Sequence, residues 1–412
     1  MTGLKRTLPA GVRPASPLSA DQNEQSDAPE FAGSHWIDAT VGRVSMTQNA
    51  IHPQPVDAML LGGSFGGPFL EAADREMLDT LKSLQTHFQP IAATLTANAA
   101  EALQHAVARV RRADRFRLLC IIGADHGDDI LGRSTGSVES LRESFGPLMA
   151  GITHVSPEDT ESVSAAMDDS VAAILVSPTL LAAGGRVLSP RFLEHLADIC
   201  HASQAALIVD QRGLPPLGAG RFFAHEAIAE IPVDAVLMSA GCFGGYPGGA
   251  IFWGPRFQAG GHFHHGGHPA SSPWHRSLFL QPLETLANDG DFEQADANAE
   301  AAAKDIAESV AEFRFIRDLH RLGTSIGLEL DIESAGLVAA CHARGLYLET
   351  SGRFGVQMHL PQSVDAEDLA ELLRRLRDAF ADYQSTLTAS DKPAELLESD
   401  FADENEQTLA AE

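Results

Sequence analysis

Lysine is scarce in this sequence, and none occurs between Lys82 and Lys304. That span holds most of the alternating strand and helix patterns described below. The absence excludes chemistry that depends on a side-chain amine anywhere within the span, because a lysine is the side chain that condenses with a carbonyl group. Any activity located there has to use other groups.

Cysteine is also rare. The four cysteines are Cys120, Cys200, Cys242 and Cys341, and no two of them form a C-x-x-C pair. Such wide spacing does not suggest a disulfide framework or a zinc ribbon. Most of these cysteines lie inside apolar runs, where a thiol behaves as a small hydrophobic group. We therefore expect a reducing, cytoplasmic environment.

Basic residues are far fewer than acidic ones, and long apolar runs are absent. The sequence has 29 Lys and Arg against 56 Asp and Glu, a formal net charge of −27, which argues against nucleic acid and anionic membrane as partners. No stretch approaches the roughly 20 apolar residues of a membrane span, and residues 1–20 have no apolar core typical of a signal peptide. Small molecules and proteins remain as candidate partners.

Apolar residues make up 44% of the chain, enough to bury a sizeable core. Strand-like apolar runs alternate with segments of helical period, the pattern of βαβ units in an α/β fold with a mostly parallel sheet flanked by helices. The predicted strands are residues 117–122, 172–176, 206–209, 235–238 and 249–253. Helices are predicted over residues 97–112 and 191–202, each with one apolar face.

The C-terminal part has a different pattern, which predicts a smaller α+β domain. A long helix over residues 292–313 is followed by a strand at 325–330, a helix at 332–344, strands around Leu346 and Val356, and a helix at 366–383 that begins after Asp365. The predicted organisation is a disordered arm (1–30), a segment packing with the small domain (31–65), a large α/β domain (66–300), the small domain (301–388) and an acidic disordered tail (389–412).

Five strings in this order carry a family resemblance. They are FGPLMAGITHV at 145–155, SPRFLEHLADIC at 189–200, ALIVD at 206–210, RFFAHE at 221–226 and GGYPGGA at 244–250. The chain resembles the class III aminotransferases, of the acetylornithine and ornithine type with the pyridoxal-phosphate fold type I, over roughly residues 33–383. The resemblance implies a seven-stranded sheet in the large domain and a homodimer with cofactor sites at the subunit interface.

The resemblance also shows a loss. In the family a lysine shortly before the glycine-rich turn forms the Schiff base with the cofactor aldehyde. Aligned through Gly244, Gly245 and Pro247, its position falls on Ala240, whose methyl group cannot react. We therefore expect no catalytic residue for lysine-dependent transamination and no covalently bound cofactor; weak binding of pyridoxal phosphate stays open. The arginine that commonly holds the substrate carboxylate aligns with Gln357.

Six residues align with positions that bind the cofactor in the family: Asn98, Ala99, Ala100, His126, Asp210 and His268. Asp210 would pair with the pyridine nitrogen, or would bond the turn that follows its strand. Asn98 and Ala99 replace a Ser-Gly or Thr-Gly pair at a helix N-terminus, where backbone N–H groups would hold a phosphate or another small anion. The alternative for Asn98 is an ordinary N-cap.

The other two positions have changed surroundings. His126 follows Asp125 where the family has an aromatic ring that stacks on the cofactor, and a carboxylate removes that stacking surface. His268 aligns with a threonine that reaches the neighbouring subunit's phosphate. It lies in the histidine-rich loop 261–275, which also holds His262, His264, His265 and His275. Their spacing matches no recognised zinc pattern, so we assign no metal, although the question stays open.

Two functions compete on these grounds, and whether the protein is an enzyme stays open. The first is a pseudoenzyme, a homologue that has lost lysine-dependent transamination and acts as a regulatory or structural subunit. It would form a homodimer or pair with an active paralogue, and it would bind a small molecule or anion. The alternative is an active aminotransferase-type enzyme, acetylornithine-like, that uses pyridoxal or pyridoxamine phosphate with a base other than lysine.

Overall fold

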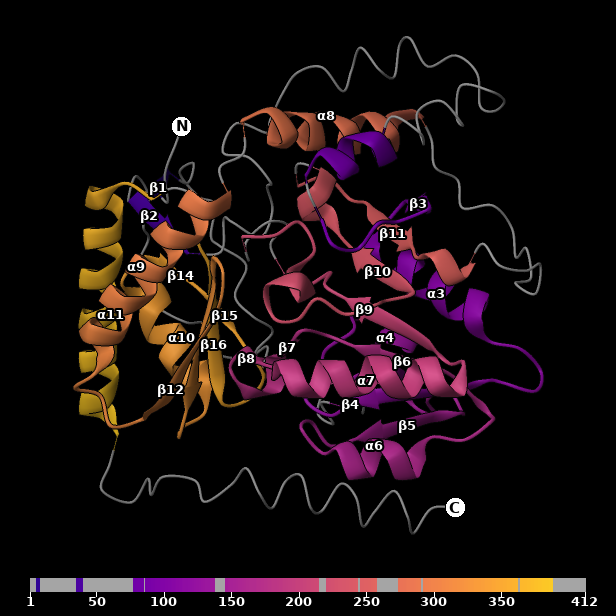
Figure 1. The fold of residues 1–412 in the computed structure, drawn as a ribbon. Coiled ribbons are helices and arrows are strands. Elements are labelled where there is room, and N and C mark those ends of the chain that lie inside the picture. Colours follow the sequence, from indigo (N-terminus) through magenta and orange to yellow (C-terminus); the bar gives the residue numbers. More distant parts are fainter. Residues whose placement is uncertain are drawn as a thin grey trace.

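The computed structural model describes residues 5–7, 35–39, 77–84, 86–137, 145–214, 220–243, 245–257, 273–289, 292–361 and 364–387. These residues form a larger α/β part built on a seven-stranded sheet and a smaller part built on a four-stranded sheet (Figure 1). The two-stranded hairpin of β7 (Thr179–Leu180) and β8 (Arg186–Val187) lies between them.

The large sheet has the strand order β3-β11-β10-β9-β6-β4-β5. Its strands are β3 (Ala92–Thr96), β4 (Arg117–Ile121), β5 (Ile152–Val155), β6 (Val171–Val176), β9 (Ala206–Asp210), β10 (Ala235–Met238) and β11 (Gly249–Trp253). Adjacent strands from β10 to β5 are parallel, and only β11 runs against its neighbours. The predicted mostly parallel α/β sheet is confirmed, and the five predicted strands are all present.

Helices cover both faces of this sheet. They are α3 (Ala99–Val110), α4 (Ile130–Thr135), α6 (Thr160–Ala166), α7 (Pro190–Ser203) and α8 (Pro273–Asp289), with short turns η3 (Leu181–Ala183), η4 (Ala224–Ala227), η5 (Ala240–Phe243) and η6 (Pro255–Phe257). Helix α7 begins after Ser189, whose side chain accepts a hydrogen bond from Phe192 N, and Pro190 suits the first turn because it needs no N–H partner.

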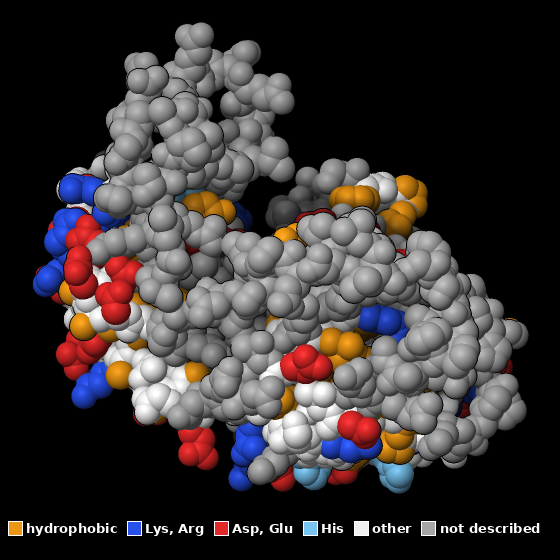
Figure 2. All heavy atoms as spheres, turned by 90° about the horizontal axis from the view of Figure 1, so that it is seen from above, with side chains coloured by type: hydrophobic (Ala, Val, Ile, Leu, Met, Phe, Trp, Pro, Cys, Tyr) orange, Lys and Arg blue, Asp and Glu red, His pale blue; other side chains and the backbone are white. Residues whose placement is uncertain are grey.

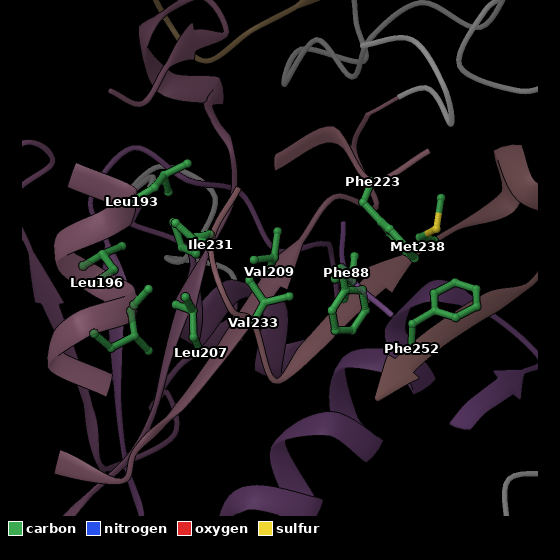
Figure 3. Close-up of a cluster of buried hydrophobic side chains, with 14 of the residues drawn as sticks. Phe88, Leu193, Leu196, Leu207, Val209, Phe223, Ile231, Val233, Met238 and Phe252 are labelled. Atoms are coloured by element: carbon green, nitrogen blue, oxygen red, sulfur yellow. The ribbon is translucent and has the colours of Figure 1, made fainter. Parts of the chain in front are cut away.

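Alternate residues of each strand pack on opposite faces. In β9, Leu207 and Val209 join the cluster that contains the apolar face of α7, whereas Ala206 and Ile208 join the cluster that contains α3. Figure 3 shows Leu193 and Leu196 of α7 beside Leu207 of β9. Because both faces are buried, the strands read as continuous apolar runs, which is why they were recognisable in the sequence.

The smaller part follows the predicted pattern closely. Its elements are α9 (Phe292–Val310), β12 (Ile316–Leu322), β13 (Ser325–Leu330), α10 (Ser334–Ala343), β14 (Leu346–Tyr347), β15 (Glu349–Thr350), β16 (Gly355–His359) and α11 (Ala366–Thr386). Helix α11 begins after Asp365, whose carboxylate accepts a hydrogen bond from Asp368 N, as predicted. A separate hydrophobic cluster joins α9, α10 and α11 to β13 and β16.

Two short N-terminal strands extend this part. Strand β2 (His35–Asp38) pairs in parallel with β14, and Ile37 is buried in the cluster of the smaller part. Strand β1 (Lys5–Thr7) pairs with β2, so these three residues of the predicted arm are in a sheet. The rest of the arm and the acidic tail lie outside the described residues. The domain boundaries remain predictions.

The surface on the side of α9 and α11 carries interspersed charges of both signs (Figure 2). On α11, Arg374 pairs with Glu371 at 2.8 Å and with Asp378 at 2.9 Å. Such exposed pairs contribute little to stability. None of the helices in the described ranges is both long and apolar enough to span a bilayer.

Candidate functional site

The candidate site lies where several strands of the large sheet end at the same edge. Asp210 is the last residue of β9, Ser239 follows β10, and His126 lies in the loop after β4. Helix α3 begins just after β3. Parallel strands bring their carboxyl ends to one edge, and open α/β sheets bind ligands there. The fold therefore brings most of the predicted positions together.

Asp210 forms a buried ion pair with Arg212. The Arg212 Nε lies 2.8 Å from Asp210 Oδ1, and Nη2 lies 2.6 Å from Oδ2. The backbone N–H of Arg212 also donates to Oδ1, at 3.1 Å. The side chains of Asp210 and Arg212 are only 3% and 7% exposed, so water does not screen this pair. Two parallel charge-assisted bonds between a guanidinium and a carboxylate are the strongest form of such a contact.

The same guanidinium ties the surrounding loops together. Nη1 donates to the carbonyl oxygen of Ala99, at the start of α3, at 2.8 Å. Nη2 also donates to the carbonyl oxygen of His126 at 2.6 Å. The hydroxyl of Ser239 donates to the carbonyl oxygen of Arg212 at 2.5 Å. Arg212 thus links the ends of β3, β4, β9 and β10 through one residue.

His126 completes the carboxylate's contacts. Its Nδ1 lies 2.8 Å from Asp210 Oδ2, and the imidazole is fully buried. Its Nε2 is buried and has no partner among the described residues. A carboxylate offers about four acceptor positions. Three donors of Arg212 and one ring nitrogen of His126 account for all of them.

These partners keep Asp210 ionised. Burial by itself raises the pKa of Asp210, but the charge of Arg212 and the hydrogen bonds from His126 and Arg212 outweigh it and hold the pKa well below its usual value. Arginine stays protonated in proteins. The pair is therefore a carboxylate and a guanidinium at neutral pH.

The start of α3 is capped from within the chain. The Asn98 side chain accepts from Glu101 N at 2.9 Å, and the Glu101 carboxylate accepts from Ala97 N at 2.7 Å. This reciprocal arrangement is a capping box. The N-cap alternative for Asn98 is confirmed. Binding of an anion by the backbone of Asn98, Ala99 and Ala100 remains a prediction.

Asp125 and Gln357, which align with other functional positions of the family, form hydrogen bonds within the chain. Asp125 accepts from Gly127 N at 3.0 Å, which stabilises the turn after β4. Gln357 is buried in β16, and its Nε2 donates to Ser325 Oγ at 2.9 Å. Ala240 begins η5. Neither Asp125 nor Gln357 replaces the group that the family uses.

The histidine-rich loop is almost wholly outside the described residues. His262, His264, His265 and His268 lie there, whereas His275 is part of α8. Within the described part of the chain, no cluster of three or more His, Cys, Asp or Glu side chains is placed to hold a metal ion. The predicted interface role of His268 stays a prediction.

The described residues do not fit pyridoxal phosphate in the manner the resemblance implies. A protonated ring nitrogen needs a free acceptor on Asp210, and Arg212 and His126 use both carboxylate oxygens. The aromatic stacking surface is replaced by Asp125. A cofactor ring in that position would have to displace a buried guanidinium.

Arg212 was missed in the sequence, although one signal was present. Only one residue separates Arg212 from the strand-end Asp210, and the turn that follows β9 brings the arginine back to the carboxylate. A basic residue two positions after an acidic strand end is therefore a candidate internal partner. The link to Ala99 and His126 depends on loops far apart in sequence.

Comparison with known proteins agrees with this fold. The family model "Aminotransferase class-III" matches residues 32–380. Acetylornithine aminotransferase from Rhodobacter capsulatus is 26% identical over 300 residues, covering 70% of this chain and 76% of that protein. The one from Brucella melitensis is 24% identical over 364 residues, covering 84% and 88%.

Solved structures show the same fold. Ornithine aminotransferase from Toxoplasma gondii superposes with a TM-score of 0.73 at 18% identity, covering 89% of this chain and 94% of that one. N-acetylornithine aminotransferase from Stenotrophomonas maltophilia has a TM-score of 0.68 at 21% identity, covering 86% and 93%. From the family match and the common fold, this chain belongs to the class III aminotransferases.

Proposed function

We propose that this protein is a pseudoenzyme of the class III aminotransferase family, which is dependent on pyridoxal phosphate. It has lost lysine-dependent transamination and acts by binding. The observation that carries the proposal is the lack of an amine at the site, because the position of the family's lysine holds Ala240. A methyl group neither condenses with an aldehyde nor carries a proton.

The lysines whose side chains are described support this reading. Lys82 lies in the helical residues 77–83, is 59% exposed and pairs with Asp79 at 2.8 Å. Lys304 is exposed on α9, which packs in the smaller part of the molecule. Neither side chain contacts Asp210, whose partners are Arg212 and His126. A substitute amine from these two positions would require a large rearrangement.

The proposed role is that of a regulatory or structural subunit. The chain would form a homodimer, as its family typically does, or would pair with an active paralogue. Purification from the native source separates the two cases, because recovery solely as a self-dimer contradicts the pairing with a paralogue.

An activity assay tests the proposal itself. The full chain is incubated with pyridoxal phosphate and with several amino donors, including acetylornithine and ornithine, and the formation of the keto or aldehyde product is measured. A class III enzyme such as the Rhodobacter capsulatus relative serves as the positive control. The proposal predicts turnover no higher than that of free cofactor, and enzymatic turnover would refute it.

A second candidate is an enzyme that holds pyridoxamine phosphate without a covalent bond and uses a base other than lysine. One observation favours it: the Nε2 of His126 has no partner among the described residues, so this nitrogen is free to move a proton. Against it, Asp210 is fully bonded within the chain. An absorbance titration with both forms of the cofactor separates the candidates, because tight binding favours the second.

A further inference from the structure

We infer that Arg212 is a built-in counter-ion that closes the strand-end site and excludes a cationic ligand ring from Asp210. This inference concerns ligand binding and the stability of the ligand-free protein, so it goes beyond the loss of transamination. It assigns to one side chain the role that a bound molecule has in related enzymes: neutralising the buried carboxylate.

The carboxylate of Asp210 has no acceptor position left for a ligand. Arg212 contributes three hydrogen bonds to Asp210, at 2.6, 2.8 and 3.1 Å, and His126 contributes a fourth at 2.8 Å. A protonated ring nitrogen would need one of these acceptor positions. Displacing the guanidinium would leave a second buried charge without a partner, which costs far more than a single hydrogen bond.

Arg212 also connects the loops that surround the site. In open α/β sheets, ligands bind among the loops at the carboxyl ends of the strands. Here the Arg212 guanidinium contacts the Ala99 carbonyl at the start of α3 and the His126 carbonyl in the loop after β4. The guanidinium thus donates four hydrogen bonds to protein acceptors. The loop at Gly127 also lies close to it, because a Cβ built on Gly127 would be 3.8 Å from Nη1. The loops are held without a ligand.

Nearby carboxylates favour the charged form of Arg212. Asp125 and Asp129 both act on Arg212 in the direction that keeps it protonated. Arg133 lies 3.7 Å from Asp125, so part of this negative charge is balanced within the chain. The surroundings therefore stabilise the internal guanidinium.

A double-mutant cycle tests the internal pair in the ligand-free full chain. The variants are Arg212→Gln, Asp210→Asn and the double variant, with Arg117→Gln as the matched control because Arg117 pairs with the half-exposed Asp168. Arg212→Gln is expected to lower Tm by on the order of 5 °C, since it leaves a buried carboxylate without its counter-ion. The double variant is expected to lose much less than the sum of the single changes.

A binding experiment tests the exclusion. Pyridoxamine 5′-phosphate is the probe, because it carries the ring and the phosphate and needs no lysine. Its affinity is measured by calorimetry for the wild type, for Arg212→Ala and for the control Arg117→Gln. We expect Arg212→Ala to bind at least ten-fold more tightly than the wild type, and the control to behave as the wild type does. If Arg212→Ala does not fold, Arg212→Gln takes its place.

The two experiments together support or refute the inference. Coupling in the cycle together with a gain of affinity in the Arg212 variant supports the inference. Additive losses in the cycle would overturn it, and so would equal affinity of the wild type and the variant, including no detectable binding by either. The cycle uses no cofactor and measures no turnover. Transaminase activity of the wild type would therefore refute the proposed function and would leave the result of the cycle unaffected. Additive losses in the cycle would refute the inference about Arg212 and would leave the proposed function unaffected.

Discussion

The Nη2 of Arg186 lies 2.9 Å from each carboxylate oxygen of Glu329. Arg186 is in the β7–β8 hairpin, between the two parts of the molecule, and Glu329 is in β13 of the smaller sheet. The Glu329 side chain is 1% exposed, and it also accepts from His320 at 3.0 Å and contacts Arg317 at 3.4 Å. One buried carboxylate thus fixes the hairpin to the small sheet.

Replacing Glu329 by Gln should strongly destabilise the protein. We expect a loss of about 2 kcal/mol in the free energy of unfolding, because the buried carboxylate loses its charge-assisted hydrogen bonds with the partly exposed Arg186 and with His320. The measurement is urea-induced unfolding at pH 7. The control is Glu333→Gln, since Glu333 is 60% exposed and pairs with the exposed Arg353. The control should change stability by less than about 0.5 kcal/mol, and equal effects of the two substitutions would contradict the assignment.

The contribution of Glu329 should disappear in acid. Burial opposes ionisation, but hydrogen bonds from His320 and Arg186 and the charge of Arg186 lower the pKa of Glu329 from 4.5 to about 2. A carboxyl group with a depressed pKa stabilises the fold fully above its unfolded pKa, and this stabilisation is lost as the pH falls from 4.5 toward 2. The difference in stability between wild type and Glu329→Gln should therefore be constant above pH 6 and shrink below pH 4.5. A pH-independent difference would show that the charge is not what matters.

His225 should make the protein sensitive to mild acid. It is buried beside Phe88 and Phe223, and neither ring nitrogen has a partner among the described residues. Burial lowers the pKa of His225 from 6.5 to about 3, so the unfolded chain binds a proton between these values and the folded chain does not. Stability is then lost as the pH falls below 6.5, by about 1.4 kcal/mol per pH unit from this group.

The variant His225→Phe should remove that component of the acid slope. Phenylalanine suits the aromatic surroundings and cannot be protonated. Unfolding free energies of the wild type and the variant are compared from pH 7 to pH 4, with the exposed His201→Gln as control. The control should keep the slope of the wild type. An unchanged slope in His225→Phe would mean that the buried imidazole does not govern this range.

Gly184 should tolerate no side chain. Its φ is +61°, and a Cβ there would lie 2.7 Å from the carbonyl oxygen of Leu328 in the facing strand. Gly146 has a similar φ of +68° but open space around it. Gly146→Ala should cost about 1 kcal/mol for backbone strain alone. Gly184→Ala should lower the free energy of unfolding by at least about 2 kcal/mol more, because the segment at Gly184 and the strand at Leu328 must move apart. Similar thermal shifts for both variants would argue against this close approach.

The sequence revealed the central strands but missed those at the edges. Strands β6, β9 and β10 are buried on both faces, so each appears as an apolar run. Strands β3 and β5 lie at the two edges of the sheet, and several of their residues are partly exposed. Their sequences, AATLT and ITHV, have no continuous apolar run. The edge strand β12 of the small sheet, IRDLHRL, was missed for the same reason.

The local structural roles of Asp210 and Asn98 could be predicted from the sequence, but the contacts of Asp210 could not. The sequence identified Asp210 as a strand end and Asn98 as a helix N-cap, because both depend on local patterns. The partners of Asp210 depend on which side chains the folded strand ends bring within reach. His126 lies 84 positions away in sequence. Arg212 lies only two positions away, but its guanidinium is also held by the carbonyl groups of Ala99 and His126, which are distant in sequence.

The central claim is that no side chain of this protein holds pyridoxal phosphate as a covalent imine. The most direct test is incubation of the full chain with the cofactor, reduction with borohydride and mass mapping of the peptides. We predict no stoichiometric adduct on any residue of the large part, with at most a slow, substoichiometric reaction at exposed lysines such as Lys82. One stoichiometric adduct on a residue near Asp210 would contradict it.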